Sequence, residues 1–472
     1  MSGATRTIAR NTIVQAAADI LGKVATLAFY VVMARELGES GFGDFTLALS
    51  LALVLTVFAE FGTDEILTRT VAVERGTARQ LLTDALLVKL AFGFAGVIGA
   101  VVVAFVGGYT AEVRAAVAIL AVAAVVELLA KSFYATFQAL DDMRPVAMSF
   151  IVQRYVTAAV GIVAMLAGAG VVAVAAVYLG GALLALAYGA SRLVRRVRPS
   201  SHLSSARARA LVRASAAIGI GMLLNTALFR LDAVILSQFK GNDAVGFYGV
   251  AYRLLESTLF ITYTFVAALL PTLSRLTADS TPTIGEAFEL GLKLIAMALL
   301  PIGVGFVLFA EPMVHLLYGS DYDPSVPAVR LLGVAAAFYG VSFLGATALI
   351  AQGRQRVLPW ITAVVLVLNV GLNLLVIPEY SFKGAAAVTS ISEVVLAIMT
   401  LVFVLRLTGR VSALRVVSGP VVGCVAIGVV ALVAGTGLLG LVLGALVYLP
   451  VLFAVEHRFF PHDVRRLRDV VR

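Results

Sequence analysis

Polar side chains inside otherwise apolar segments are the residues of this chain whose types and spacing suggest chemistry. In the segment 12–34 they recur every three or four residues, and they are Thr12, Gln15, Asp19, Lys23, Thr26 and Tyr30. This interval places them along one face of a helix. An ionisable group deep in a membrane span costs roughly 2.5–3.5 kcal/mol on insertion, so it is expected to face protein or water. The stripe therefore predicts a polar helix face along a pathway.

Three other apolar segments carry similar groups. These are Gln153 and Arg154 in 147–169, Asn225, Arg230 and Asp232 in 214–238, and Arg253, Glu256 and Ser257 in 246–270. Arginine is suited to bidentate contact with phosphate. We therefore predict that an anionic group, such as a diphosphate or an acidic sugar, is bound by Lys23, Arg154, Arg230 and Arg253, with Gln15 and Asn225. The predicted carriers of a coupling proton or sodium ion are Asp19, Asp232 and Glu256.

A structural role competes with this interpretation. Asp19 with Lys23, and Arg253 with Glu256, are four and three residues apart, so each pair can neutralise itself on one helix face and lower the cost of burial. A second expectation concerns four basic residues near the ends of predicted spans, Lys89, Lys131, Lys293 and Arg330. Their long side chains are expected to extend to the lipid headgroups.

These residues belong to a chain composed as a membrane protein. It has 472 residues, of which 61% are hydrophobic and 13% charged, and its mean hydropathy is +1.01. Soluble domains carry about 25% charged residues. Apolar runs of about 20 residues, the length that spans the hydrocarbon as a helix, recur throughout. The prediction is an all-α polytopic membrane protein with about fourteen spans: 12–34, 42–61, 81–106, 114–137, 147–169, 171–192, 214–238, 246–270, 288–310, 328–350, 358–377, 385–405, 416–435 and 437–456.

Arginines between the spans predict the orientation. They gather in alternate connections and at both ends of the chain, as in the run from Arg192 to Arg213 and the tail up to Arg472. The other connections hold only Arg35, Arg114, Lys240 and Lys383. Because basic residues are retained on the cytoplasmic side, we expect both termini to be cytoplasmic and the chain to lie in the cytoplasmic (inner) membrane, in contact with its lipids.

The remaining composition excludes several classes of function. The net charge of +9 follows this membrane pattern, so it does not indicate nucleic acid. Cys424 is the single cysteine, and no metal-ligand spacing such as H-E-x-x-H is present, so we expect no disulfide, no metal site and no cofactor. No G-x-x-x-x-G-K-[ST] loop occurs, so any transport would be driven by an ion gradient, by a partner, or by consumption of the product outside.

Two pairs of similar segments indicate an internal repeat. Gly38–Phe45 matches Gly241–Tyr248, each just before an even-numbered span, and Gln138–Pro145 matches Gln352–Pro359. Both matches join predicted loops of the same side, so the halves are predicted to be parallel repeats. The expected organisation is a six-helix lobe at 1–194, a basic cytoplasmic linker at 195–213, a second six-helix lobe at 214–405, and two additional spans with a basic tail at 406–472. The two lobes would enclose a central cavity.

Several loop motifs carry a resemblance to a known family. They are Ala34–Phe45, Asp243–Arg253, Leu316–Tyr322 and Ala351–Arg356, followed by Asn369, Asn373, Ile377–Pro378 and Gly384–Ala386. In this order they resemble the polysaccharide transporter (O-antigen flippase) family of the multidrug/oligosaccharidyl-lipid/polysaccharide exporter superfamily. The resemblance implies a flippase that moves an undecaprenyl-diphosphate-linked oligosaccharide to the outer leaflet by alternating access. It also implies polysaccharide polymerase or export proteins as partners.

Three alternatives remain at this point. A cation-coupled multidrug antiporter has the same architecture, and a flippase for peptidoglycan or teichoic-type lipid precursors is not separated by sequence. A membrane glycosyltransferase or polymerase would need a sizeable external loop with catalytic carboxylates. The loop containing Asp321 and Asp323 is short and is expected to be a turn. We therefore predict a transporter and no enzyme.

Overall fold

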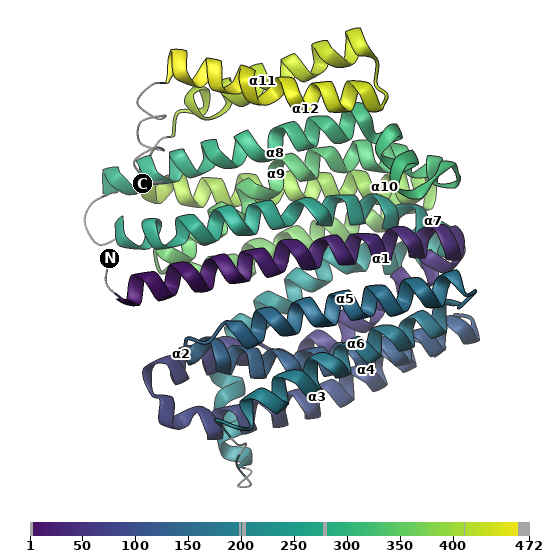
Figure 1. Ribbon diagram of the computed structural model, residues 1–472, viewed down its shortest axis with the longest axis vertical. Helices are drawn as coiled ribbons and strands as arrows, with labels where there is room; N and C mark the ends of the chain where they lie inside the picture. The colour runs from purple at the N-terminus through teal and green to yellow at the C-terminus, as the bar shows by residue number, and fades with distance from the viewer. Residues whose placement is uncertain (1–2, 198–199, 201–203, 277–280, 410, 461–472) are drawn as a thin grey trace. The chain divides into compact units, whose positions relative to one another are not determined.

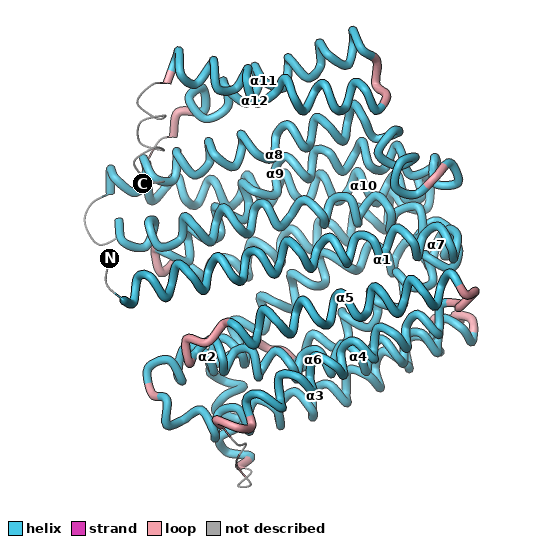
Figure 2. The backbone as a smooth tube through the Cα atoms, in the orientation of Figure 1, coloured by secondary structure: helices cyan, strands magenta, loops and turns pink. Residues whose placement is uncertain are grey.

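The computed structural model describes the backbone of residues 3–197, 200, 204–276, 281–409 and 411–460, and the side chains of these residues except 3–20, 260, 263–276 and 281–284. Within this part the chain is helical and contains no strand, which confirms the predicted all-α class. Figure 2 shows helices joined by short loops. The chain forms two compact units, residues 1–249 and 250–472. The predicted boundaries of the two lobes and of the linker stay predictions.

The helices of the first unit are labelled in Figure 1. They are α1 (Gly3–Thr56), α2 (Thr63–Val73), α3 (Ala78–Val106), α4 (Ala111–Ala139), α5 (Arg144–Leu166), α6 (Val171–Leu193) and the beginning of α7 (Ser205–Leu276). The second unit holds the rest of α7, then α8 (Thr281–Tyr318), α9 (Val326–Ala351), α10 (Leu358–Thr408), α11 (Ala413–Ala434) and α12 (Leu438–Phe459). Short 3-10 turns occur at Val57–Ala59, Arg75–Thr77, Ser320–Ser325 and Gln355–Val357.

Eleven helical segments of the described chain are long and apolar enough to cross a membrane, so this is a multi-pass membrane protein. Three of them are much longer than the roughly 20 residues of one crossing, and they are Leu21–Ala59, Ser205–Leu259 and Gln355–Thr408. Each contains one residue of left-handed backbone, respectively Gly38, Gly241 and Ser381. These breaks lie in the predicted loops 35–41, 239–245 and 378–384. The count of about fourteen crossings stays a prediction.

The breaks at Gly38 and Gly241 are the first residues of the two matched octets. Their backbone angles are nearly the same, with φ of 67° and 79° and ψ of −176° and −178°. A side chain is disfavoured in this conformation, which explains a glycine at both positions. The second matched pair also forms the same local structure, a helix end followed by a helix with proline in its first turn. Local structure therefore agrees with the predicted repeat.

The two octets contact each other inside the first unit at a pair of glycines. A Cβ atom on Gly43 would lie 1.9 Å from the carbonyl oxygen of Asn242, and one on Gly246 would lie 2.1 Å from that of Glu39. The Asn242 amide also donates a hydrogen bond to Asp44. Small residues allow helix backbones to approach this closely in membranes.

Gly43→Ala is expected to lower the free energy of unfolding by about 1–3 kcal/mol, because the added methyl group forces the two backbones apart. Gly99→Ala is the matched control: Gly99 lies inside α3, and a methyl group added there would meet no atom within 4 Å. That variant is expected to be neutral or slightly stabilised, since alanine favours the helix. Thermal unfolding of the purified protein in detergent measures both. Equal midpoints for the two variants would contradict the close contact.

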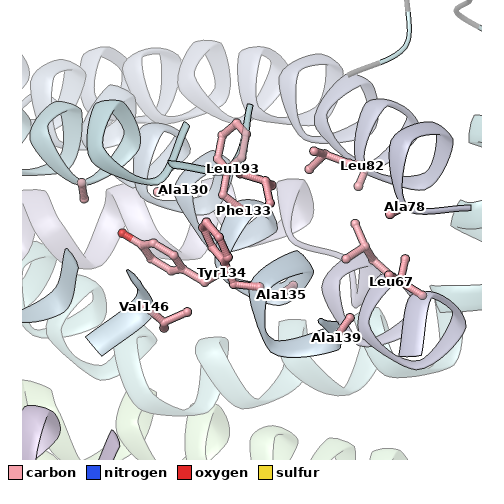
Figure 3. Packing of buried hydrophobic residues seen from close by; sticks show 14 of the residues in the cluster. Leu67, Ala78, Leu82, Ala130, Phe133, Tyr134, Ala135, Ala139, Val146 and Leu193 are labelled. Carbon is pink, nitrogen blue, oxygen red and sulfur yellow. The ribbon is translucent and has the colours of Figure 1, made fainter. Parts of the chain in front are cut away.

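The core of the first unit joins α2 to α6. Figure 3 shows Phe133 and Tyr134 of α4 between Val146 of α5 on the left and Leu82 of α3 and Leu67 of α2 on the right, with Leu193 of α6 near Phe133. The beginning of α7 is held to the same unit by polar contacts. Arg207 donates to the buried Asp84 at 2.9 Å, and the hydroxyls of Tyr109 and Ser237 are 2.9 Å apart. These contacts place residues 205–249 with the first unit.

In the second unit a buried ion pair attaches α12 to α8. Lys293 Nζ lies 2.6 Å from Glu456 Oε2, and both side chains are almost fully buried. Lys293 was expected to extend to the headgroups, and this expectation is wrong, because a carboxylate of another helix lies within its reach. Arg330, by contrast, is exposed.

Candidate functional site

A cavity of about 260 Å³ lies inside the first unit, among α1, α4, α5 and α6. The residues that line it are Thr26, Phe29, Tyr30, Glu127, Ala130, Lys131, Tyr134, Phe150, Gln153, Arg154, Thr157, Ala158 and Tyr178. The lining combines aromatic rings with hydroxyl, amide and charged groups. Such a mixture suits a ligand that has both polar and apolar parts.

Arg154 brings a guanidinium group to this cavity. Its Cζ atom lies 5.5 Å from the centre of the Phe150 ring, one turn earlier on α5. The side chain packs against Gly22 of α1, where a Cβ atom would lie 2.6 Å from Arg154 Cδ. Among the side chains that the structure describes, no carboxylate forms an ion pair with Arg154. Its donors can therefore serve an anionic ligand.

The neighbouring polar groups are joined across helices. Gln153 donates a hydrogen bond of 2.7 Å to Glu127 of α4, and the Tyr178 hydroxyl of α6 also hydrogen-bonds to this carboxyl. Lys131 lies one turn after Glu127 and places its Nζ 3.2 Å from Glu60. The cavity thus presents two basic groups, and the acidic groups beside them are already hydrogen-bonded.

A second charged cluster lies close in sequence to these residues. Lys89 Nζ is 2.6 Å from Asp64 Oδ2 and donates to the Leu128 carbonyl at 2.7 Å, while Ser132 donates to Asp64 Oδ1 at 2.8 Å. The Lys89 side chain is fully buried. The expectation that it extends to the headgroups is therefore wrong, since its charge is neutralised by a carboxylate of α2 inside the protein.

Three predicted ligands of the first unit, Lys23, Arg230 and Asn225, are not among the residues that line this cavity. Lys23 is half-buried and follows Gly22, the residue that packs on Arg154. Arg230 is half-buried and Asn225 is exposed on α7. The side chains of Gln15 and Asp19 are outside the described residues. The structure thus places Arg154 in a cavity, and Gln153, which was singled out beside it, lines the same space.

The predicted ion-coupling carboxylates have donors of their own. Asp232 is buried, accepts a 2.8 Å hydrogen bond from the Ala233 amide, and also accepts one from the Tyr248 hydroxyl. In the second unit Arg253 lies 2.6 Å from Glu256, with side chains 10% and 20% exposed. The charge pair anticipated as a structural alternative is therefore formed. A central chamber that unites these residues with Arg154 stays a prediction.

Glu127 and Tyr178 were missed as site residues. Glu127 is the one carboxylate within the predicted span 114–137, and it precedes Lys131 by four residues. An isolated acid in an apolar helix is a signal that could have been followed. Its contact with Gln153, however, depends on how α4 and α5 pack, which neither segment reveals alone.

Comparison with known proteins places this chain in a family. The model of the polysaccharide biosynthesis protein family matches residues 8–277, more than half of the chain, and the MatE model matches residues 217–375. A curated relative, the probable low-salt glycan biosynthesis flippase Agl15 of Haloferax volcanii, is 22% identical over 390 residues, which cover 82% of this chain and 81% of the relative. The uncharacterised membrane protein MJ1068 of Methanocaldococcus jannaschii is 24% identical over 193 residues, 40% of this chain and 38% of its own.

Solved structures share the fold. The lipid II flippase MurJ in an inward closed conformation superposes with a TM-score of 0.77 at 14% identity, over 98% of this chain and 100% of its own. An inward-facing multidrug resistance MATE family transporter gives a TM-score of 0.67 at 16% identity, over 83% of this chain and 97% of its own. The match of the family model, together with this fold, confirms the resemblance that the loop motifs carry. The chain belongs to the polysaccharide biosynthesis protein family of the multidrug/oligosaccharidyl-lipid/polysaccharide exporter superfamily.

Proposed function

We propose that this protein is a flippase that translocates an undecaprenyl-diphosphate-linked oligosaccharide across the cytoplasmic membrane by alternating access, and that it catalyses no covalent reaction. The observation that carries the proposal is Arg154, a guanidinium group lining a cavity without a carboxylate partner among the described side chains. Membership of a polysaccharide biosynthesis family and similarity to a probable glycan biosynthesis flippase support it.

The physical task of such a protein explains the lining. A diphosphate that leaves water loses its hydration, and a guanidinium group replaces it with paired, charge-assisted hydrogen bonds. The amide of Gln153 and the hydroxyls of Thr157 and Tyr134 offer hydrogen bonds suited to a sugar, while Phe29 and Phe150 offer apolar faces. The polyprenyl tail stays in the lipid during transfer.

The direction of transport follows from the proposed orientation. With both termini in the cytoplasm, as the arginine distribution predicts, the substrate enters from the cytoplasmic leaflet and leaves on the outer side. A proton or sodium gradient supplies the drive, or a polysaccharide polymerase or export protein consumes the product. Both the coupling ion and these partners are part of the proposal.

Two related functions have observations in their favour. The MatE match over residues 217–375 favours a cation-coupled multidrug antiporter. The full-length superposition on MurJ favours a flippase for a peptidoglycan-type precursor. Both are decided by the same measurement, because they differ from the main proposal in the substrate that moves.

Purified protein in proteoliposomes is the direct test. Labelled undecaprenyl-diphosphate oligosaccharide in one leaflet is expected to appear in the opposite leaflet only in vesicles that contain the protein, and a membrane-impermeant enzyme that modifies the sugar can report that exposure. A lipid-linked peptidoglycan precursor and a cationic amphiphile are tested in parallel. Movement of only the precursor would select the second function, and ion-driven efflux of only the amphiphile would select the antiporter.

A further inference from the structure

Glu393 is a buried carboxyl group that plays no part in the site described above. It lies on α10 and is 7% exposed. Its hydrogen-bonding partner is the hydroxyl of Ser342 on α9, which is itself buried. The two helices belong to the second unit and pack along each other. The group therefore sits between helices and not at a surface loop.

The hydrogen bonds around Ser342 indicate which form of the carboxyl fits. The Ser342 hydroxyl also lies 2.9 Å from the carbonyl oxygen of Tyr339, in donor geometry. A hydroxyl has only one proton to donate. A neutral carboxylic acid satisfies both contacts, because Glu393 donates to Ser342 and Ser342 donates to Tyr339. An ionised carboxylate satisfies only one.

No described basic side chain stands near enough to neutralise an ionised Glu393. The charged residue of α9 is Arg330, about 18 Å along the helix from Ser342, and on α10 Lys383 and Arg406 are about 15 and 20 Å away at 1.5 Å per residue. The charged and titratable groups that α8 contributes are Glu286, Glu289, Lys293, Glu311, His315 and Tyr318. Of these, Lys293 pairs with Glu456, Glu289 with Arg415 and His315 with Asp323.

The carboxylates predicted from sequence to carry an ion have different surroundings. Asp232 accepts hydrogen bonds from the Ala233 amide and the Tyr248 hydroxyl, and Glu256 pairs with Arg253. Donors and cations of this kind stabilise the ionised form. Glu393 has no cation beside it among the described side chains, and the single proton of the Ser342 hydroxyl is also claimed by the Tyr339 carbonyl, so the neutral form is favoured there. A buried acid without a cation exchanges its proton only when its surroundings become hydrated.

We propose that Glu393 is a proton-binding site inside the second unit, and that loss and recovery of this proton accompany the conformational cycle of transport. The second clause rests on the proposed function, whereas the first does not. In the cycle, one conformation holds the neutral acid between α9 and α10, and the other opens this region to water and releases a proton.

Infrared difference spectroscopy of the protein in lipid vesicles tests whether Glu393 carries a proton, and it needs no substrate. Wild type near neutral pH is expected to show the carbonyl stretch of a protonated carboxylic acid that is missing from Glu393→Gln. Glu379→Gln is the matched control, because Glu379 lies on the same helix and is exposed; it is expected to leave this band unchanged. Ser342→Ala retains the acid but removes its hydrogen-bonding partner, so it is expected to shift the band. If Glu393→Gln does not fold, this shift is the measurement that assigns the band to Glu393.

Transport under an imposed pH gradient tests the coupling. Wild type is expected to move lipid-linked sugar faster with the gradient than without it, and Glu393→Gln is expected to lose this acceleration while Glu379→Gln keeps it. An infrared band that is the same in wild type and Glu393→Gln would overturn the proton site. A normal response of Glu393→Gln to the gradient would overturn the coupling. If wild type moves no lipid-linked sugar, the proposed function and the coupling fall, while the infrared result still decides the site.

Discussion

Lys89→Met is expected to lower the free energy of unfolding of the first unit by about 3–5 kcal/mol, the range measured when one partner of a buried ion pair is removed. Methionine keeps nearly the length and volume of the lysine chain, so packing is not the cause of the loss. What remains is the carboxylate of Asp64, 8% exposed, with Ser132 as a hydrogen-bond donor and no ammonium group at 2.6 Å. The carbonyl of Leu128 also loses its hydrogen bond from Lys89.

Thermal unfolding in detergent, followed by size-exclusion chromatography, measures the effect. Arg75→Met is the matched control, because Arg75 pairs with Asp141 at 3.0 Å but the two side chains are 65% and 72% exposed. Exposed pairs contribute about 1 kcal/mol or less, so this variant is expected to unfold close to wild type.

The double variant Lys89→Met, Asp64→Asn separates charge from shape. It is expected to recover much of the stability, because neither partner then carries an uncompensated charge. If the double variant is as unstable as Lys89→Met alone, the loss comes from packing and the buried-charge explanation fails.

The membrane spans could be predicted because hydropathy and length are local properties. Even the positions of the helix breaks followed from sequence, as Gly38, Gly241 and Ser381 fall within three predicted loops. Gly38 and Gly241 begin the two matched segments, so the repeat in sequence corresponds to a repeated break in the helix. A polar glycine-containing interruption is visible in one segment, without knowledge of its neighbours.

Pairings between helices could not be predicted in this way. Lys89 and Lys293 were expected at the headgroups because each lies near a span end, but their partners, Asp64 and Glu456, come from other helices. Asp64 follows the predicted end of a span and was not considered part of the interior. Which faces meet is set by helix rotation and packing, and one segment's periodicity contains neither.

In the candidate site, too, local features could be predicted from sequence and contacts between helices could not. Arg154 could be singled out as a cation within an apolar segment, and it lines a cavity. Glu127 on α4, which takes the amide hydrogen bond of Gln153, was overlooked because its function depends on that contact across helices. Glu393 was overlooked for the opposite reason, since its significance lies in having no cation among the described neighbours, which only a structure can reveal.

Arg154→Ala is expected to slow the flipping of undecaprenyl-diphosphate oligosaccharide by about tenfold or more. Hydrogen bonds to a charged group contribute about 1.5–3 kcal/mol, and 1.4 kcal/mol corresponds to a factor of about ten. No described carboxylate forms an ion pair with Arg154, and the buried Glu127 in the same cavity keeps its hydrogen bonds from Gln153 and Tyr178 when Arg154 is removed, so folding is expected to be retained. Arg154→Lys keeps the charge but loses the planar, two-pronged geometry, so an intermediate rate is expected. Initial rates in proteoliposomes, at equal amounts of folded protein, measure the series.

Arg192→Ala provides the control, because the Arg192 guanidinium lies 5.3 Å from the Tyr188 ring on α6, much as Arg154 lies 5.5 Å from Phe150 on α5. The two arginines thus share the same contact with a ring one turn earlier, but Arg192 is exposed and is not part of the cavity lining. A slow Arg154→Ala beside a normal Arg192→Ala would assign the effect to the cavity and not to the loss of an arginine–ring contact. Equal slowing of both would place the effect in helix packing, and wild-type rates in both would mean that the diphosphate takes a path that does not include Arg154.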